Sequence, residues 1–342
     1  MICRGKSPPP PFCKGGSITT TEGFEMKIQP IDLTAVKTYP IAERKNKVSL
    51  ARDFAGAITP GMTVSALLAA MPNQLGAENL NAAIDAIVAA RRKGKPVVIA
   101  IGGHVIKCGL QPVLKALIDA DVVTAVAMNG SASIHDYEIS LIGETSEDVG
   151  AVLHCGTFGM AEETGRDINR ALKSGVAEGL GYGEALGRFI RENRNPHAGS
   201  SLLAACHAKG IPATVHVAMG TDIIHQHPEA DGAVLGQATF TDFRLFTSVV
   251  ATLGDGGVFI NIGSAVIMPE VFLKALSIAQ NMGFHVDHFT TVNFDMQQHY
   301  RPLQNVVKRP TAGDSRGLAI TGHHEIMIPL LAAGVLDKIS AA

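Results

Sequence analysis

The stretch KPVVIAIGGHVIKCGLQPVLKALIDAD, residues Lys95 to Asp121, sets a strand, a glycine turn and helical patterns in direct succession. Its first part is a run of apolar, largely β-branched residues that ends in Gly102-Gly103, and the residues after it have helical spacing. Continuous rather than alternating hydrophobicity is typical of a strand that is buried on both faces of a parallel sheet. The stretch therefore predicts one strand-turn-helix unit of an α/β fold.

The same unit recurs along the chain. Further buried strands are predicted at Val122–Met128, Ala213–Met219, Gly257–Gly263 and Phe289–Phe294. Helical patterns lie between them, at Ala161–Ser174, Tyr182–Glu192, Ser200–Lys209, Asp242–Leu253, Met268–Asn281 and His323–Ala333. Strand, turn and helix repeated in this order predict a doubly wound, mostly parallel α/β sheet of the Rossmann-like type.

The N-terminal region differs in composition from the rest. Residues 1–25 contain a proline run and Gly, Ser and Thr but no apolar signal-peptide core, so we expect a disordered extension. We expect residues 26–342 to form a single α/β domain, because no linker interrupts it. Its 26–94 part reads as helical, with patterns at Val64–Met71 and Leu80–Lys93, and residues 95–335 form the sheet core.

Composition excludes several classes of protein. The formal net charge of −2 gives no electrostatic reason to expect nucleic acid as a partner. No apolar stretch approaches the ~20 residues of a membrane span. The five cysteines show no CxxC spacing, which predicts a reduced, cytoplasmic protein. Only 18% of the residues are charged, and this indicates wide buried surfaces, such as a covered sheet or a subunit interface.

Small and polar residues follow the predicted strands. In parallel sheets, ligands bind beyond the carboxyl ends of the strands, and small residues there let backbone N–H groups approach a ligand. Several such turns in one chain predict an extended ligand such as a dinucleotide, although no GxGxxG fingerprint is present. The candidate cofactor-binding residues are Gly103, His104, Asn129, Gly130, Ser131, Thr221, Asp222, Gly263, Ser264, Asn293, Gly322 and His323.

Two sets of ionisable residues can be interpreted in more than one way. His135 and Asp136, which follow the strand end AVAMNGSAS, either perform chemistry or cap a helix. The histidines His225, His227, His323 and His324 suit zinc or iron in a metal-dependent hydrolase, although no HExxH spacing is present. A non-catalytic nucleotide-binding protein is a third interpretation, because a fold alone does not decide function.

An ordered series of segments from about Lys95 to Val335 resembles the deoxyhypusine synthase family. The segments are GGHVIKCGL, VAMNGSASIHDYEI, KGIPATVHVAMGTDII, GGVFINIGSAVIMPEVFLKA and TGHHEIMIPLL. The first matches a helix start at Gly103-His104, the third matches a Thr-Asp pair at Thr221-Asp222, and the fourth matches a glycine triplet at Gly263-Ser264-Ala265. The last matches a helix whose first turn lies on the cofactor.

The resemblance implies an NAD-binding homotetramer that abstracts a hydride from a polyamine and transfers an aminoalkyl group to a protein lysine. It gives acid, base or amine-holding roles to His135, Asp136, Glu138, His225 and Glu325, and makes Lys308 the candidate nucleophile. Two family motifs have no match here. The family's Lys-His-His segment is replaced by Met268-Pro269-Glu270, and its Trp-Gly-Lys segment is missing because the chain contains no tryptophan.

Overall fold

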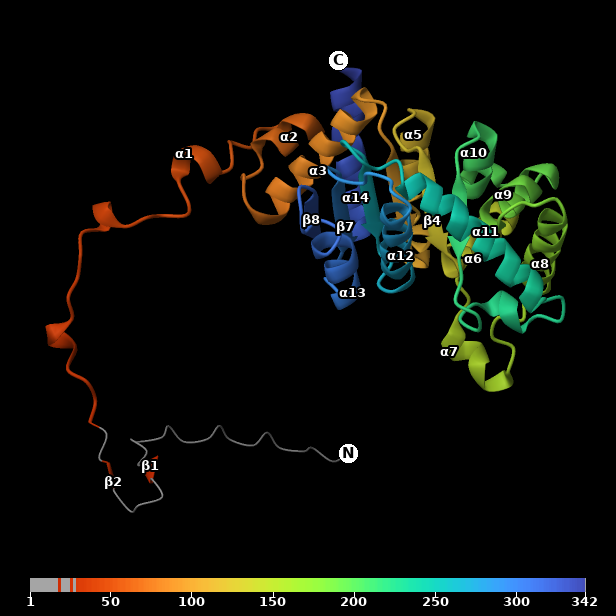
Figure 1. The fold of residues 1–342 in the computed structure, drawn as a ribbon, viewed down its shortest axis with the longest axis horizontal. Helices are drawn as coiled ribbons and strands as arrows, with labels where there is room; N and C mark the ends of the chain where they lie inside the picture. The colour runs from red at the N-terminus through yellow and green to blue at the C-terminus, as the bar shows by residue number, and fades with distance from the viewer. Residues whose placement is uncertain (1–17, 20–24, 27–28, 342) are drawn as a thin grey trace. The chain divides into compact units, whose positions relative to one another are not determined.

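The apolar runs of the sequence form one parallel sheet of six strands. A computed structural model describes residues 18–19, 25–26 and 29–341, and Figure 1 shows its fold. The sheet has the spatial order β5-β4-β3-β6-β7-β8. Counted from β3, this is the 3-2-1-4-5-6 order of a Rossmann fold, so the predicted fold class is confirmed. The strands are β3 (Val97–Ile101), β4 (Ala125–Asn129), β5 (Ala213–His216), β6 (Val258–Ile262), β7 (Thr290–Asp295) and β8 (Arg316–Thr321).

Helices connect the strands and cover both faces of the sheet. They are α1 (Leu50–Asp53), α2 (Val64–Ala70), α3 (Leu75–Arg92), α4 (Gly103–Lys107), α5 (Gln111–Asp119), α6 (Gly130–Ile142), α7 (Val149–Val152), α8 (Glu162–Ala177), α9 (Tyr182–Glu192), α10 (Leu202–Lys209), α11 (Gly232–Val250), α12 (Ile267–Asn281), α13 (Tyr300–Pro302) and α14 (His324–Ser340). The 3-10 turns η1 (Leu33–Ala35), η2 (Ile41–Glu43), η3 (Leu153–Cys155), η4 (Ala198–Ser200) and η5 (Ile223–Gln226), and the π-helix η6 (Leu303–Lys308), complete the connections.

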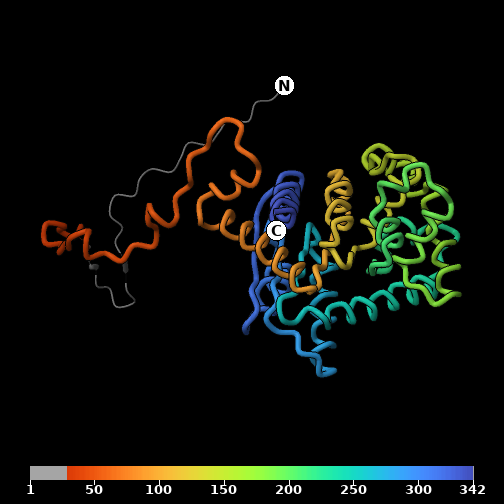
Figure 2. The backbone as a smooth tube through the Cα atoms, turned by 90° about the horizontal axis from the view of Figure 1, so that it is seen from above, coloured from red at the N-terminus to blue at the C-terminus, as the bar shows by residue number. Residues whose placement is uncertain are grey.

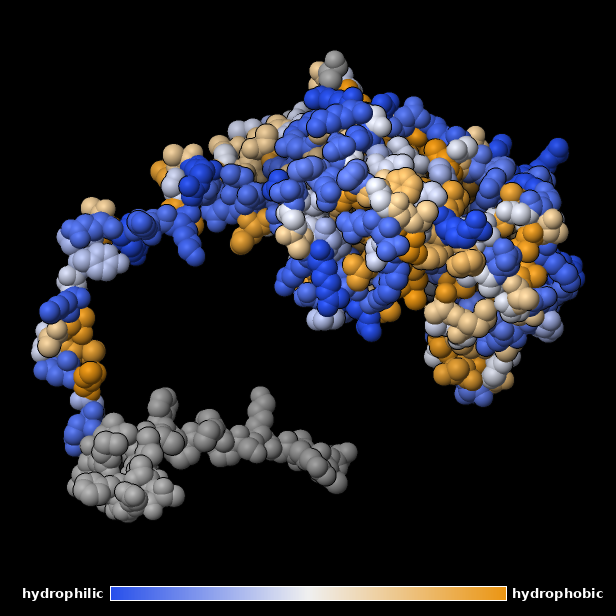
Figure 3. Space-filling view, viewed as in Figure 1, coloured by the Kyte–Doolittle hydropathy of each residue, from blue (hydrophilic) through white to orange (hydrophobic). Residues whose placement is uncertain are grey.

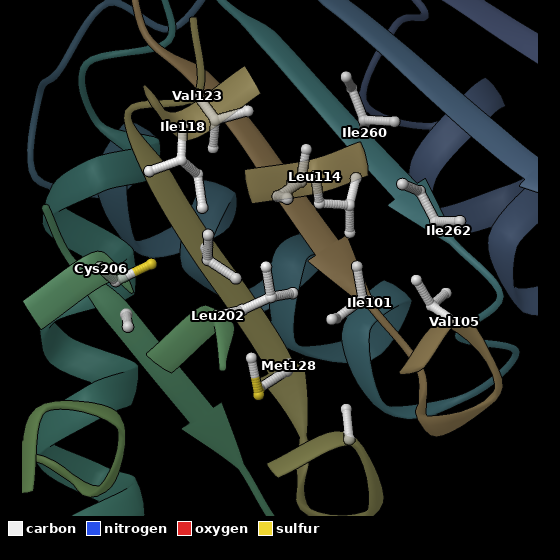
Figure 4. Close-up of a cluster of buried hydrophobic side chains, with 14 of the residues drawn as sticks. Ile101, Val105, Leu114, Ile118, Val123, Met128, Leu202, Cys206, Ile260 and Ile262 are labelled. Atoms are coloured by element: carbon white, nitrogen blue, oxygen red, sulfur yellow. The ribbon is translucent and has the colours of Figure 1, made fainter. Parts of the chain in front are cut away.

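Alternate residues of each central strand enter different hydrophobic cores. Val97, Ile99 and Ile101 of β3 belong to the larger core, whereas Val98 and Ala100 belong to a second core with side chains of α11 and α12. Figure 4 shows the larger core, in which side chains of β3, β4 and β6 meet those of α4, α5 and α10. Figure 2 shows α14 and α11 on opposite sides of the sheet. Burial on both faces explains the continuous hydrophobicity of these strands.

One strand and two element boundaries differ from the sequence-based prediction. Strand β8 was not expected, because it is an edge strand in which only Leu318 and Ile320 are buried. Helix α11 begins ten residues before the predicted Asp242, since its first half contains glycine and polar residues. Strand β5 ends at His216 because the next N–H group, that of Val217, donates to Thr239 of α11 at 3.2 Å instead of to a strand.

The chain divides into two compact units, residues 1–49 and 50–342. Within the first unit, β1 (Ile18–Thr19) pairs antiparallel with β2 (Glu25–Met26), and residues 29–49 contain only the turns η1 and η2. The helices of the region that was predicted as helical therefore begin at Leu50. The predicted disordered extension lies, apart from 18–19 and 25, outside the described residues. In the described part of the chain, no helix has both the length and the apolarity needed to span a bilayer.

Candidate functional site

The switch point of the sheet lies between β3 and β6, where the connections leave in opposite directions. Glycines let the two strand ends approach closely, because a Cβ on Gly102 would lie 2.3 Å from the carbonyl oxygen of Gly263. Gly263 has a left-handed φ of 63°, and a Cβ there would lie 2.6 Å from Nε2 of His324. Ligands of doubly wound sheets bind beyond such a point. The glycines predicted at these strand ends are therefore required by the packing itself.

Two histidines from separate helices meet beside this switch point. The rings of His104 and His324 lie edge to face, with centroids 6.1 Å apart. His324 is 6% exposed, its Nδ1 has no hydrogen-bond partner, and burial holds its pKa below the usual value. His323 occupies the N-cap of α14 without a side-chain capping bond, so the first N–H groups of this helix are not capped by its N-cap side chain. Gly103, Ser264 and Gly322 lie at the ends of β3, β6 and β8.

A cavity of about 900 Å³ lies along α6, next to the switch point. Its walls are α6, the segment that follows it, the beginning of α8 and Thr221–Ile223. Gly103 connects the switch point with the cavity, because it follows β3 and packs closely against α6. A Cβ on Gly103 would lie 2.2 Å from Oγ of Ser131 and 3.1 Å from Cδ2 of His135. The residues that the sequence predicted and that line this cavity are Ser131, His135, Glu138, Thr221 and Asp222.

The cavity lining is strongly acidic. Five carboxylates line it against one ammonium group, that of Lys107 at the end of α4. Glu138 and Asp222 were predicted from the sequence, whereas Lys107 and three other carboxylates, Glu144, Glu147 and Glu163, were not. The run GETSED after α6 was the available signal for Glu144 and Glu147. Lys107 and Glu163 gave no local signal, because other elements bring them to the cavity.

A hydrogen-bonded relay connects His135 to Glu138 through Thr145. The Thr145 hydroxyl donates to Oε2 of Glu138, and its oxygen lies 2.7 Å from Nδ1 of His135. Because the hydroxyl proton is used, Nδ1 must donate to Thr145, which leaves Nε2 of the neutral ring as an acceptor. Thr164 donates to the other Glu138 oxygen at 3.0 Å. Burial raises the pKa of Glu138, but the interactions with His135 and the two threonines outweigh it, and the net pKa lies below the usual value.

Asp222 lies at the other wall, against the first turn of α6. A Cβ on Gly130 would lie 2.0 Å from Oδ2 of Asp222, so any other residue there would displace this carboxylate. This oxygen is buried without a hydrogen-bond partner, and burial raises the pKa of the carboxyl. Nearby, Nδ1 of His225 accepts from the N–H groups of Gly220 at 3.1 Å and Asp222 at 3.3 Å. His225 therefore orders the loop, and it does not line the cavity.

His135 and Asp136, for which both chemistry and helix capping were expected as alternatives, lie in different surroundings. His135 lines the cavity, but Asp136 is fully buried behind it. The Asp136 carboxylate accepts from the Ser201 hydroxyl at 2.6 Å and from the N–H groups of Leu202 at 2.8 Å and Leu203 at 3.2 Å. Burial raises its pKa to about 6. Asp136 thus caps α10, and its placement does not support the predicted acid, base or amine-holding role.

Three further predicted residues lie away from the cavity. Asn129 caps α6 by accepting from the N–H of Ala132 at 3.0 Å. Asn293 is buried and hydrogen-bonded to Asn261 and Gln298, so its side chain does not face a ligand. Glu325 lies on the first turn of α14, 4.0 Å from the Cys108 sulfur.

Lys308 lies at the wrong end of the sheet for a nucleophile. Lys308 is the last residue of the π-helix η6, in which the Val306 carbonyl accepts from the hydroxyl of Thr291, the second residue of β7, at 2.7 Å. This contact puts η6 beside the amino ends of the strands, whereas the cavity and switch point lie at the carboxyl ends. Lys308 itself is exposed. Within one chain, this position gives no support to its predicted role.

The four-histidine metal site is not formed. Across residues 29–341 and the two short strands before them, no three His, Cys, Asp or Glu side chains are grouped so as to hold a metal ion. His227 instead accepts from the N–H of Glu229 at 3.1 Å, and His324 packs on Gly263 and His104. The structure thus gives no support to the hydrolase alternative.

The segment between α6 and α8 forms one side of the cavity and projects from the body. Figure 3 shows apolar residues on this projection, where Val149, Leu153 and Met160 are exposed. Within the segment, Glu147 accepts from the N–H of Gly159 at 2.9 Å. The side chain of Gln226 in η5 connects the segment to the body by donating to the Phe158 carbonyl at 3.0 Å.

Fold and site together define a Rossmann-like α/β protein with an acidic cavity at the carboxyl edge of its sheet. No family model and no curated protein sequence matches the chain. Among solved structures, a single-substitution mutant of AgrE in complex with L-arginine matches 80% of this chain and 35% of its own, with 14% identity and a TM-score of 0.50. AgrE with ornithine and NAD+ matches 78% of this chain and 33% of its own, with 14% identity and a TM-score of 0.47.

The chain spans about a third of the length of these AgrE structures. A protein from Entamoeba histolytica described as a candidate deoxyhypusine synthase matches 81% of this chain and 94% of its own, with 10% identity and a TM-score of 0.48. These likenesses concern the fold.

Proposed function

We propose that this chain is an NAD-dependent enzyme that oxidises a small cationic amine. One observation supports this most directly: an acidic cavity adjoins the switch point of a 3-2-1-4-5-6 sheet through the contact of Gly103 with α6. A binding site for cations and a binding region typical of dinucleotides therefore share a wall. The homotetramer, the cytoplasmic location and the aminoalkyl transfer implied by the family resemblance belong to the same proposal.

The amine occupies the acidic cavity. Ammonium groups form strong charge-assisted hydrogen bonds with carboxylates, and Glu138, Glu144, Glu147, Glu163 and Asp222 supply the acceptors. An ammonium group that binds in the cavity comes close to Asp222, which is one of the lining residues. Such a group also keeps Asp222 ionised, because an opposite charge lowers a carboxyl pKa that burial alone has raised.

His135 is the base of this proposal. Oxidation at the carbon next to an amine nitrogen requires the nitrogen to lose its proton first, so that its lone pair assists departure of the hydride. Nε2 of His135 is free to accept that proton, because Thr145 takes up Nδ1–H. Ionised Glu138 holds Thr145 in this orientation and stabilises the imidazolium that forms.

The switch point has two features that suit a bound dinucleotide. The close contact of Gly102 with Gly263 leaves the central strand ends without side chains, and the first N–H groups of α14 carry no side-chain cap. Gly263, Gly322 and His323 would hold the nucleotide, with phosphate at the N-terminus of α14. Nicotinamide supplies the hydride acceptor when bound. Asn129, at the end of β4, departs from the usual pattern because its side chain caps α6 rather than remaining available for a ribose.

Nucleotide analysis and amine oxidation together test the proposal. We expect NAD to be released when the purified protein is denatured, and NADH to form when spermidine, putrescine or a basic amino acid is added with NAD. His135→Ala should lower kcat by roughly 100-fold or more, because it removes the base. His285→Ala, at an exposed histidine, is the matched control. A protein that binds no nucleotide and forms no NADH with any of these amines would refute the proposal, and bound NAD without turnover would identify a non-catalytic nucleotide-binding protein.

A further inference from the structure

Lys107 is the one cationic residue in a lining that otherwise attracts cations. It ends α4, four residues after Gly103, and therefore lies on the helix face that packs against α6. Among the described residues, its ammonium group has no hydrogen bond or ion pair, although five carboxylates share the cavity with it. Lys107 is exposed, so water solvates its ammonium group, and this group is available to a ligand in the cavity.

A ligand that is cationic throughout leaves the ammonium group of Lys107 without an anionic partner. A linear polyamine would be attracted by the carboxylates but repelled by Lys107, because like charges within a few ångströms interact unfavourably. A ligand with a carboxylate at one end and a cation at the other satisfies both kinds of group. We infer that the cavity takes a basic α-amino acid, such as L-ornithine, L-lysine or L-arginine, with its carboxylate on Lys107. This inference rests on the proposed function and narrows its substrate class.

The positively charged and the negatively charged residues of the lining lie toward different ends of the cavity. Lys107 comes from α4, next to the strand ends, whereas Glu144 and Glu147 follow the far end of α6 and Glu163 begins α8. The lining runs along the whole of α6, from Ser131 to Ile142. The carboxylate of the amino acid therefore lies toward the switch point, and its side-chain cation lies among the three glutamates.

This orientation also decides which nitrogen meets the base. His135 and Lys107 both lie where α4 packs on α6, since Gly103 on the same face as Lys107 approaches the His135 ring. An amino acid anchored through its carboxylate on Lys107 presents its α-ammonium group, rather than its side-chain nitrogen, to Nε2 of His135. The α-carbon, which is next to the switch point, is then the position of oxidation.

Calorimetric titration with matched ligands tests the inference without any need for turnover. L-Ornithine, L-lysine and L-arginine are each compared with the amine that lacks only the carboxylate, namely putrescine, cadaverine and agmatine. We expect at least one amino acid to bind the wild-type protein tenfold or more tightly than its amine. Lys107→Met should abolish this preference by weakening the amino acid alone, and Lys107→Arg should retain much of it because the charge remains.

Lys308→Met is the matched control, since it removes an exposed lysine at the opposite edge of the sheet. It should leave every affinity unchanged. Glu163→Gln should weaken amino acids and amines alike, because both place a cation there. Equal or tighter binding of the amines by the wild-type protein, or a preference that survives Lys107→Met, would overturn the inference while leaving amine binding intact. Failure of all six ligands to bind would overturn the proposed function as well.

Discussion

Replacing the buried Asp242 by asparagine is expected to change how the stability of the protein depends on pH. Asp242 lies on α11 with no exposed surface, and its Oδ2 accepts from the N–H groups of Gly183 at 2.9 Å and Val215 at 2.7 Å. Oδ1 is buried without a partner. Burial raises the pKa of this carboxyl to about 8, from an ordinary value of 3.8. The folded protein thus holds a proton that the unfolded chain has released at neutral pH.

The sign and size follow from this difference in bound protons. Between the two pKa values the folded state binds one proton more, so the free energy of unfolding falls as pH rises, by about 1.4 kcal/mol per pH unit. Asp136, with a folded pKa of about 6, has the same effect only below that pH. His216 has a pKa lowered by burial to about 3 and acts with the opposite sign, between pH 3 and 6.5. From pH 6.5 to 8, Asp242 should therefore dominate these three groups and cost up to about 2 kcal/mol.

Urea unfolding followed by circular dichroism at pH 6.5 and pH 8 measures this difference. The asparagine oxygen can accept the same two N–H bonds, so Asp242→Asn should fold at pH 6.5 and lose less stability than the wild-type protein on going to pH 8. Asp287→Asn, at an exposed aspartate, is the control and should keep the wild-type pH dependence. If Asp242→Asn and the wild-type protein lost equal stability over this interval, Asp242 would not be protonated in the folded state.

Two further substitutions test the packing around the cavity. Gly103→Ala should destabilise the protein by about 1–3 kcal/mol and weaken amine binding, because its Cβ would lie 2.2 Å from Oγ of Ser131. Gly76→Ala, which has open space around it, should not destabilise, and equal effects of the two in urea unfolding would contradict the assigned contact. Asp136→Ala should cost about 2–4 kcal/mol by removing the acceptor of three hydrogen bonds, yet leave the calorimetric affinity for amines unchanged. A folded Asp136→Ala variant that lost amine binding would show that Asp136 contacts the ligand.

The architecture of the sheet was predictable because its signals are local. Each central strand alternates between two hydrophobic cores, so every residue of β3 is apolar and the run stands out in the sequence. Glycine at the strand ends was visible for a related reason, because close contacts such as that of Gly102 with Gly263 tolerate no Cβ. Strand β8 was missed because an edge strand buries only some of its residues.

The acidic cavity was only partly predictable, since its charges come from separate segments. His135 and Asp136 are neighbours in the chain, but successive residues of a helix point about 100° apart, and only the packing of α6 against α4 and α10 decides which of them faces the cavity. Lys107, Glu144 and Glu163 have no common motif and meet only after α4, α6 and α8 have packed. The sequence by itself determined the doubly wound sheet and its glycine-lined edge, because burial and close backbone approach restrict residue types one by one. The tertiary structure alone decided which ionisable groups share a cavity, because that depends on distances between segments that no local pattern encodes.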